Sequence, residues 1–180
     1  MEHEERDISE KCWFALRVTY NRELKVKEEL DAKRVECFIP MRYKYVVQNE
    51  KRVRRLVPSV HNLLFVRMSY SEMKEFKRTT QLPVRYIMNR ESHKPIVIPE
   101  SQMRNFIAVS GTNAEQLVYI SPCELKAKKG DKVRILGGLF AGCEGVFMRI
   151  KGDRRVVVSI PGVVAVATAF IHPSMIEKLE

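Results

Sequence analysis

A chain of 180 residues with 45% hydrophobic side chains is long enough for one packed domain or two small ones. Its formal net charge of +10 attracts anionic partners, among which nucleic acid is the commonest, although such a charge can also serve solubility alone. No signal peptide and no apolar run of about 20 residues is present, so we expect a soluble, cytoplasmic protein without membrane contact.

The chain opens with a polar, acidic stretch at 1–10, which predicts a disordered N-terminus. The next segment, CWFALRV at 12–18, mixes aromatic and β-branched side chains and predicts a strand. RELKVKEELDAKR then combines strong helix formers with Val26 and Leu30, four residues apart on one face. A strand followed by a helix is therefore expected.

Two segments that alternate apolar and basic residues come next, ECFIPMRYKYVV and RVRRLVP. They flank the turn-like Gln48-Asn49-Glu50 and predict a β-hairpin with a charged outer face. NLLFVRM, at 62–68, is apolar enough to be a central strand.

The segment SEMKEFKRT predicts a second, short helix, with Ser71 as the candidate N-cap. PVRYIM predicts a strand, and a third helix is expected from near Pro99. The side chains expected to face the core are Met73, Phe76, Met103, Phe106 and Ile107. The order β-α-β-β-β-α-β-α favours an α+β fold, with helices packed on one side of an antiparallel sheet.

Composition changes at SGTNAEQ and again at ELKAKKGD. We therefore expect a first domain at 11–110, a linker at 111–124 and a second domain at 125–180. In the second domain DKVRIL, CEGVFMRI, RRVVVSI and VAVATAF are short strand candidates between glycine-containing turns, typical of a small β-barrel. A phosphate-binding loop is disfavoured, because Cys143 and Glu144 stand where Lys and Ser or Thr are required.

No catalytic or metal-binding constellation stands out. The four cysteines form no Cys-x-x-Cys pair, and His61, His93 and His172 have no carboxylate or cysteine at metal-ligand spacing. The serines lie in no nucleophile motif. We therefore expect a protein that is not an enzyme and holds no cofactor or metal.

Two stretches resemble the NusG family of transcription elongation factors. GDKVRILGGLFAGCEGVFMRI, at 130–150, is similar to a KOW motif, and WFALRVTYNRELKVKEEL, at 13–30, is similar to the opening of an NGN domain. Their order and spacing extend the resemblance over nearly the whole chain. It implies an RRM-like NGN domain, an antiparallel sheet with flanking helices, followed by an SH3-like β-barrel KOW domain.

The resemblance also implies a function. The NGN domain would bind the clamp helices of RNA polymerase, and the protein would suppress pausing and termination. The KOW domain would dock a further factor, such as a ribosomal protein or a termination factor. His61-Asn62-Leu63 stand where many members have Pro-Gly/Asn-Tyr, which favours a specialised antitermination factor of the RfaH or UpxY kind for operons such as surface polysaccharide clusters.

Polymerase-binding positions follow from the same resemblance. The aligned apolar residues are Leu63, Phe65 and Tyr86, although alternation along a strand equally allows Phe65 to be core. In the KOW loop Phe140 matches the family's aromatic and is the candidate for partner docking. Its alternative role is to fill the barrel.

Nucleic-acid-binding positions are expected near the two helices. Tyr20, Arg22 and Lys25 match a region that faces the non-template DNA strand in specialised members, where base stacking and phosphate attraction act together. The alternative is a solvated helix face. Lys77 and Arg78, on the second helix, are further candidates.

The alternative function is a general RNA-binding module of RRM-like plus KOW type. LLFVRM partly matches the RNP1 pattern, but Asn62-Leu63-Leu64 stand where that pattern requires Lys/Arg-Gly-Phe/Tyr. RRVVVSI and VVAVATAF are dense in β-branched residues, so we expect the second domain to stay a barrel and not to refold into helices.

Overall fold

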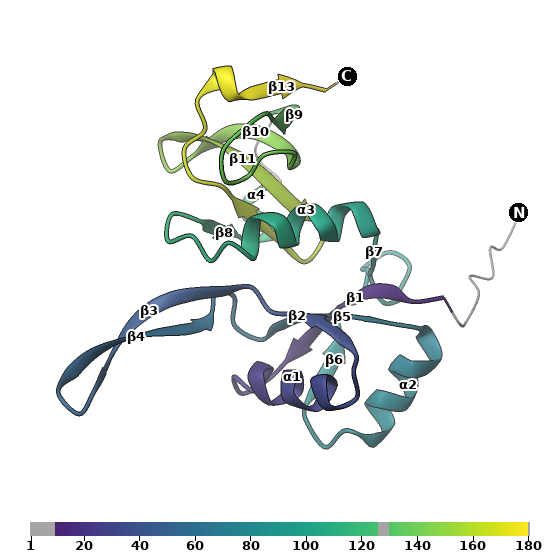
Figure 1. Cartoon of the computed structure of the whole chain (residues 1–180). Coiled ribbons are helices and arrows are strands. Elements are labelled where there is room, and N and C mark those ends of the chain that lie inside the picture. The colour runs from purple at the N-terminus through teal and green to yellow at the C-terminus, as the bar shows by residue number, and fades with distance from the viewer. Residues whose placement is uncertain (1–9, 126–129, 180) are drawn as a thin grey trace, which may run out of the picture. The chain divides into compact units, whose positions relative to one another are not determined.

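The structure is a computed structural model that describes residues 10–125 and 130–179 (Figure 1). Of the predicted disordered N-terminus, residues 1–9 lie outside the described residues. The chain divides into two compact units. The first unit is Met1–Ile39 with His61–Glu100, and the second unit is Pro40–Val60 with Ser101–Glu180. The predicted domain boundaries at 110 and 125 stay predictions.

The first unit is built on an antiparallel sheet in the order β2-β5-β1-β6, with β7 also paired to β1. The predicted strands are confirmed as β1 (Cys12–Val18) and β5 (Leu63–Met68), which pair from Cys12 with Met68 to Arg17 with Leu63. The shorter strands are β2 (Glu36–Phe38), β6 (Val84–Tyr86) and β7 (Val97–Ile98). The segment ECFIPMRYKYVV, expected as one arm of the hairpin, forms two strands, because the chain leaves the sheet at Ile39-Pro40.

Two helices, α1 (Glu23–Ala32) and α2 (Tyr70–Thr79), lie on the same side of this sheet (Figure 1). Each buries the apolar pair expected from its spacing, Val26 with Leu30 and Met73 with Phe76. The α+β fold class is therefore confirmed.

The start of α2 differs from the expectation. Ser69, and not Ser71, is the N-cap: the Ser69 hydroxyl accepts from the backbone N–H of Glu72 at 3.2 Å. The Glu72 carboxylate in turn accepts from the Ser69 N–H at 2.7 Å. This capping box requires a Glu three residues after the cap, and only Ser69 satisfies that spacing.

The second unit contains a long β-hairpin, made of β3 (Met41–Gln48) and β4 (Lys51–Pro58). Its two-residue turn has positive φ at both positions, 50° at Asn49 and 61° at Glu50, as a type I′ turn requires. The predicted hairpin is therefore confirmed. From Ser101 onward the same unit contains α3 (Glu100–Ser110), the expected third helix, which buries Met103, Phe106 and Val109 and leaves Ile107 half-buried.

The remainder of the second unit is a six-stranded antiparallel sheet in the order β13-β9-β10-β11-β12-β8. The four expected strands are β9 (Asp131–Ile135), β10 (Glu144–Ile150), β11 (Asp153–Ile160) and β12 (Val164–Ala167). They are flanked by β8 (Val118–Ile120) and β13 (Ile176–Lys178), with a one-turn helix α4 (Pro122–Leu125) and a 3-10 turn at Pro173–Met175. β8 lies inside the segment predicted as a linker.

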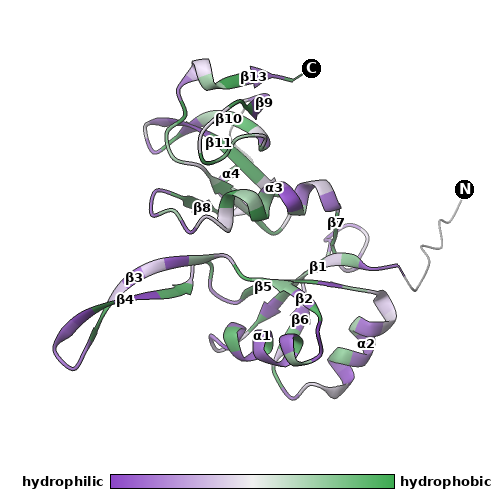
Figure 2. Cartoon of the chain, in the orientation of Figure 1, coloured by the Kyte–Doolittle hydropathy of each residue, from purple (hydrophilic) through white to green (hydrophobic). Residues whose placement is uncertain are grey.

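The strands of this sheet are mostly hydrophobic, whereas the tip of the hairpin is hydrophilic (Figure 2). The glycines of the β9–β10 stretch have structural roles. Gly142 turns the chain at a φ of 81°, and a Cβ at Gly145 would lie 2.6 Å from the carbonyl oxygen of Val157 on the next strand. The stretch is therefore a turn followed by close strand packing.

Candidate protein and nucleic-acid interfaces

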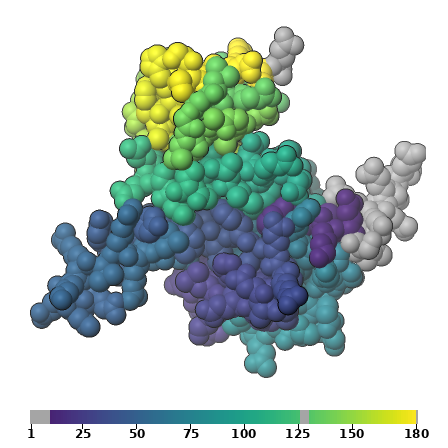
Figure 3. Space-filling model, viewed as in Figure 1, coloured from purple at the N-terminus to yellow at the C-terminus, as the bar shows by residue number. Residues whose placement is uncertain are grey.

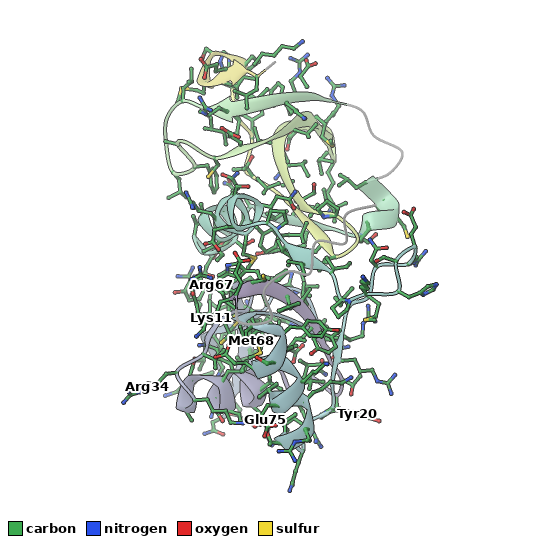
Figure 4. The ribbon with its side chains drawn as sticks, turned by 90° about the vertical axis from the view of Figure 1, so that its right-hand side faces the viewer. Lys11, Tyr20, Arg34, Arg67, Met68 and Glu75 are labelled. Carbon is green, nitrogen blue, oxygen red and sulfur yellow. The ribbon has the colours of Figure 1, made fainter. Side chains whose placement is uncertain are left out.

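The turn between β1 and α1 presents an aromatic ring to solvent. Tyr20 is 79% exposed, and the Arg22 guanidinium lies 5.8 Å from the centroid of its ring. Tyr20 and Asn21 have φ values of 63° and 51°, a left-handed conformation that is uncommon for a tyrosine. Figure 4 shows the Tyr20 side chain pointing away from the ribbon.

Backbone hydrogen bonds fix this turn on both sides. The N–H of Thr19 donates to the carbonyl of Pro83 at 3.2 Å, and the N–H of Val18 donates to the carbonyl of Asn62 at 3.0 Å. The carboxylate of Glu23, in the first turn of α1 and only 1% exposed, accepts from the Asn62 N–H. Asn62 itself has a φ of 63°. The turn is therefore held to the residues that precede β5 and β6.

Tyr86 and Lys77, predicted for different roles, meet in one cluster. The Lys77 ammonium lies 5.2 Å from the Tyr86 ring centroid, within cation–π range. The Tyr86 ring makes an edge contact with Phe14, at 6.2 Å between centroids. Beside them the partly exposed ring of Tyr70 lies 5.2 Å from the Lys74 ammonium. We call Tyr70, Tyr86, Lys74 and Lys77 the tyrosine–lysine patch.

The hydroxyl of Tyr86 is buried and has no hydrogen-bond partner among the described residues. Burial raises the pKa of this phenol to about 12, and the neighbouring Tyr70 adds to the shift. The hydroxyl therefore stays protonated at neutral pH, and any contact with a partner would be made by the ring.

Leu63 and Phe65 lie on the opposite face of the sheet from Tyr86. In the strand register Leu63 pairs with Arg17 and Phe65 with Ala15, whereas Tyr86 pairs with Leu16. Neighbouring residues of a strand point to opposite faces, so the structure does not bring the three predicted polymerase-binding residues together. Leu63 and Phe65 are also buried.

The remaining residues predicted to bind nucleic acid differ in whether their positive charge is paired with a carboxylate. Arg78 donates two hydrogen bonds to the Glu75 carboxylate, at 2.8 and 3.0 Å. These bonds lower the pKa of Glu75 and hold the Arg78 guanidinium against an opposite charge. Lys25 is exposed on α1 and has no ion-pair partner within the described part of the chain. Of the two cations predicted on α2, Lys77 therefore belongs to an aromatic cluster, whereas Arg78 is paired with Glu75.

Phe140 is buried, with 5% of its surface exposed. The same β9–β10 loop exposes Leu136 and Leu139, the latter by 69%. The sequence signal could not separate these residues, because an irregular loop has no periodicity that decides which apolar side chain turns inward.

The chain therefore consists of an α+β domain and an antiparallel β domain. A family model described as transcription termination factor nusG matches residues 11–107, more than half of the chain. The chain belongs to the NusG family, whose members are transcription factors and not enzymes. Membership of this family implies RNA polymerase as a partner.

A solved structure described as "Domain interaction in Thermotoga maritima NusG" is similar to the chain, with 23% sequence identity and a TM-score of 0.48. The match covers 95% of this chain and 98% of that chain. No curated protein matches the chain. Within residues 10–125 and 130–179 no helix is both long and apolar enough to cross a membrane, and no group of three or more potential metal ligands is found.

Proposed function

We propose that this protein is an elongation factor that binds the clamp helices of RNA polymerase, contacts the exposed non-template DNA strand and suppresses pausing and termination. The observation that carries the proposal is the exposed Tyr20–Arg22 pair inside the region that matches the family model. A tyrosine held in solvent in a left-handed turn contributes nothing to the core, so its position suits an external ligand.

The non-template strand fits the chemistry of this turn. An unpaired base can stack on the Tyr20 ring, while Arg22 and Lys25 attract the adjacent phosphates. Two or three such contacts give weak binding to free DNA, because each neutralised phosphate of a single strand contributes only about 0.7 to the slope of log K against log salt. RNA polymerase would supply the missing affinity by holding the strand nearby.

For the polymerase contact we assign different roles to the three predicted residues. Tyr86 belongs to the tyrosine–lysine patch, where rings and ammonium groups are within reach of a protein partner. Leu63 and Phe65 are buried and would act by holding β5 in place. Aromatic side chains with a polar end are the ones that interface hot spots favour.

We further propose a specialised role on particular operons, such as surface polysaccharide clusters. The support is the departure at His61-Asn62-Leu63, where the left-handed Asn62 is held by the buried Glu23. In the C-terminal domain the exposed Leu136 and Leu139 would dock a ribosomal protein or a termination factor, with Phe140 packed beneath the loop. With RNA polymerase as its partner, the protein would act in the cytoplasm.

The polymerase contact is tested by co-purification with tagged full-length protein. Tyr86→Ala should lower the recovered polymerase at least about tenfold, in line with the loss of a hot-spot residue. Leu24→Ala, which removes an exposed apolar side chain of α1, is the matched control and should recover polymerase like the wild type. A Tyr86→Ala variant that retains its circular dichroism spectrum and recovers polymerase fully would refute the contact.

The strand contact is tested separately. Replacing Arg22 and Lys25 with alanine should weaken recruitment to a paused elongation complex and leave binding to isolated clamp helices unchanged. Equal loss for both partners would show that these side chains support folding or the clamp contact.

A further inference from the structure

The β3–β4 hairpin carries a disproportionate share of the positive charge. Its 18 residues, Met41–Pro58, include six cations and one acid, Glu50, so its net charge is 6 − 1 = +5 out of the chain's +10. The cations are Arg42, Lys44, Lys51, Arg52, Arg54 and Arg55. In Figure 3 the distal half of the hairpin is a narrow arm. Nothing in the proposed function above uses it.

The strand register sorts these side chains onto two faces. One face places Lys44 directly opposite Arg55 and Gln48 directly opposite Lys51, with Arg42 at its base. We call this the basic face; Val46, Val53 and Val57 are its other members, and it has no aromatic residue. The opposite face carries the aromatic residues, with Tyr43 across from Leu56 and Tyr45 across from Arg54.

Charge on the basic face is not neutralised within the described residues. Within residues 10–125 and 130–179, one ion pair involves the hairpin, and it joins Arg54, on the aromatic face, to Glu115 at 3.0 Å. The Arg54 guanidinium also stacks on Tyr43, 3.9 Å from the ring centroid. On the basic face Arg55 donates only to the neutral amide of Gln48. Like charges directly opposite each other, as at Lys44 and Arg55, destabilise a strand pair, and an isolated hairpin is only marginally stable.

We propose that the hairpin is a second nucleic-acid-binding element, which lies against double-stranded DNA with its basic face towards the phosphates. A two-stranded β-ribbon fits the major groove of B-DNA, which is about 12 Å wide. Eight residues per strand give a ribbon of about 26 Å, and the type I′ turn keeps its end narrow. Cations on both strands of the ribbon reach phosphates on both sides of the groove.

The absence of an aromatic platform on this face separates the duplex from other nucleic acids. Single strands bind to aromatic side chains on which bases stack, and the basic face has none. Duplex RNA has a deep, narrow major groove that does not admit a ribbon. The inference goes beyond the proposed function, since the Tyr20 turn takes a single strand and the hairpin takes a duplex.

The test measures binding of the full chain to a fluorescent 20-base-pair DNA duplex as salt is varied, without RNA polymerase. Each neutralised phosphate contributes about 0.9 to the slope of log K against log salt, so K44Q/R55Q should reduce the slope by about 1.8. When the salt concentration is lowered from 1 M to 0.1 M, the affinity of the wild type should therefore increase about 60-fold more than that of K44Q/R55Q.

A second pair of arginines provides the matched control. Arg149 and Arg154 are also directly opposite on neighbouring strands, both exposed, but in the C-terminal sheet. R149Q/R154Q removes the same charge and should leave the slope unchanged. The charge-conserving variant K44R/R55K should retain the wild-type slope, which separates lost phosphate contacts from a damaged hairpin.

Three results would overturn the proposal. They are an unchanged slope for K44Q/R55Q, an equal decrease for R149Q/R154Q, and tighter binding of duplex RNA than of duplex DNA. Because polymerase is absent, failure here leaves the polymerase contact untouched, and failure of the polymerase contact leaves this result untouched.

Discussion

Removing the carboxylate of Glu23 should both destabilise the fold and loosen the turn that presents Tyr20. Glu23 is almost fully buried, and it accepts a hydrogen bond from the backbone N–H of Asn62. Glu23→Ala leaves that N–H without its partner, at a cost of about 1–3 kcal/mol. It also removes a negative charge from the first turn of α1, which adds about 0.3–1 kcal/mol. We expect a total loss of about 1–4 kcal/mol in the free energy of unfolding.

The assay is urea denaturation followed by circular dichroism, with Glu28→Ala as the control. Glu28 lies on the same helix but is exposed, so its replacement should change the free energy of unfolding by less than about 0.5 kcal/mol. Glu23→Gln retains an acceptor oxygen and should fall between the two. If Glu23→Ala is as stable as Glu28→Ala, the anchoring role of Glu23 is refuted.

Three further predictions concern single groups. The raised pKa of Tyr86 means that the folded state holds this proton more tightly than the unfolded chain. The free energy of unfolding should therefore fall as pH rises from about 10 to about 12. Tyr86→Phe should remove this part of the loss, as measured by alkaline denaturation. Ser69→Ala should cost about 1 kcal/mol in thermal unfolding, because it breaks the capping box, and a larger effect of Ser71→Ala would contradict the assignment. Burial raises the pKa of Cys37 to about 11, so its thiol should be almost unreactive towards a thiol reagent at pH 8. The number of thiols labelled in the fast phase should then be the same for the wild type and for Cys37→Ser.

The strands and helices with clear periodicity could be predicted from sequence, and the reasons are visible in the structure. β1, β5 and the four central strands of the C-terminal sheet are short apolar runs between turn residues. The short strands β7, β8 and β13 were missed, since two or three residues carry no periodic signal and their pairing depends on tertiary partners.

The candidate sites were less predictable because they depend on register and on loop conformation. Alignment of motifs could not show that Tyr86 and Phe65 point to opposite faces, since that follows from their pairing with Leu16 and Ala15. The Glu23 anchor joins residues 39 positions apart and has no local signature. The hairpin turn, by contrast, was visible in Asn49-Glu50, because its special backbone conformation favours Asn.

The most direct test of the proposed function is a single-round transcription assay with RNA polymerase from the same organism, on a template that contains a strong pause site. The lifetime of the pause is measured with and without the purified protein. The wild type should shorten the pause, and Tyr20→Ala and Tyr86→Ala should each lose this effect while staying folded. A pause lifetime that does not change when wild-type protein is bound to the elongation complex would contradict the account.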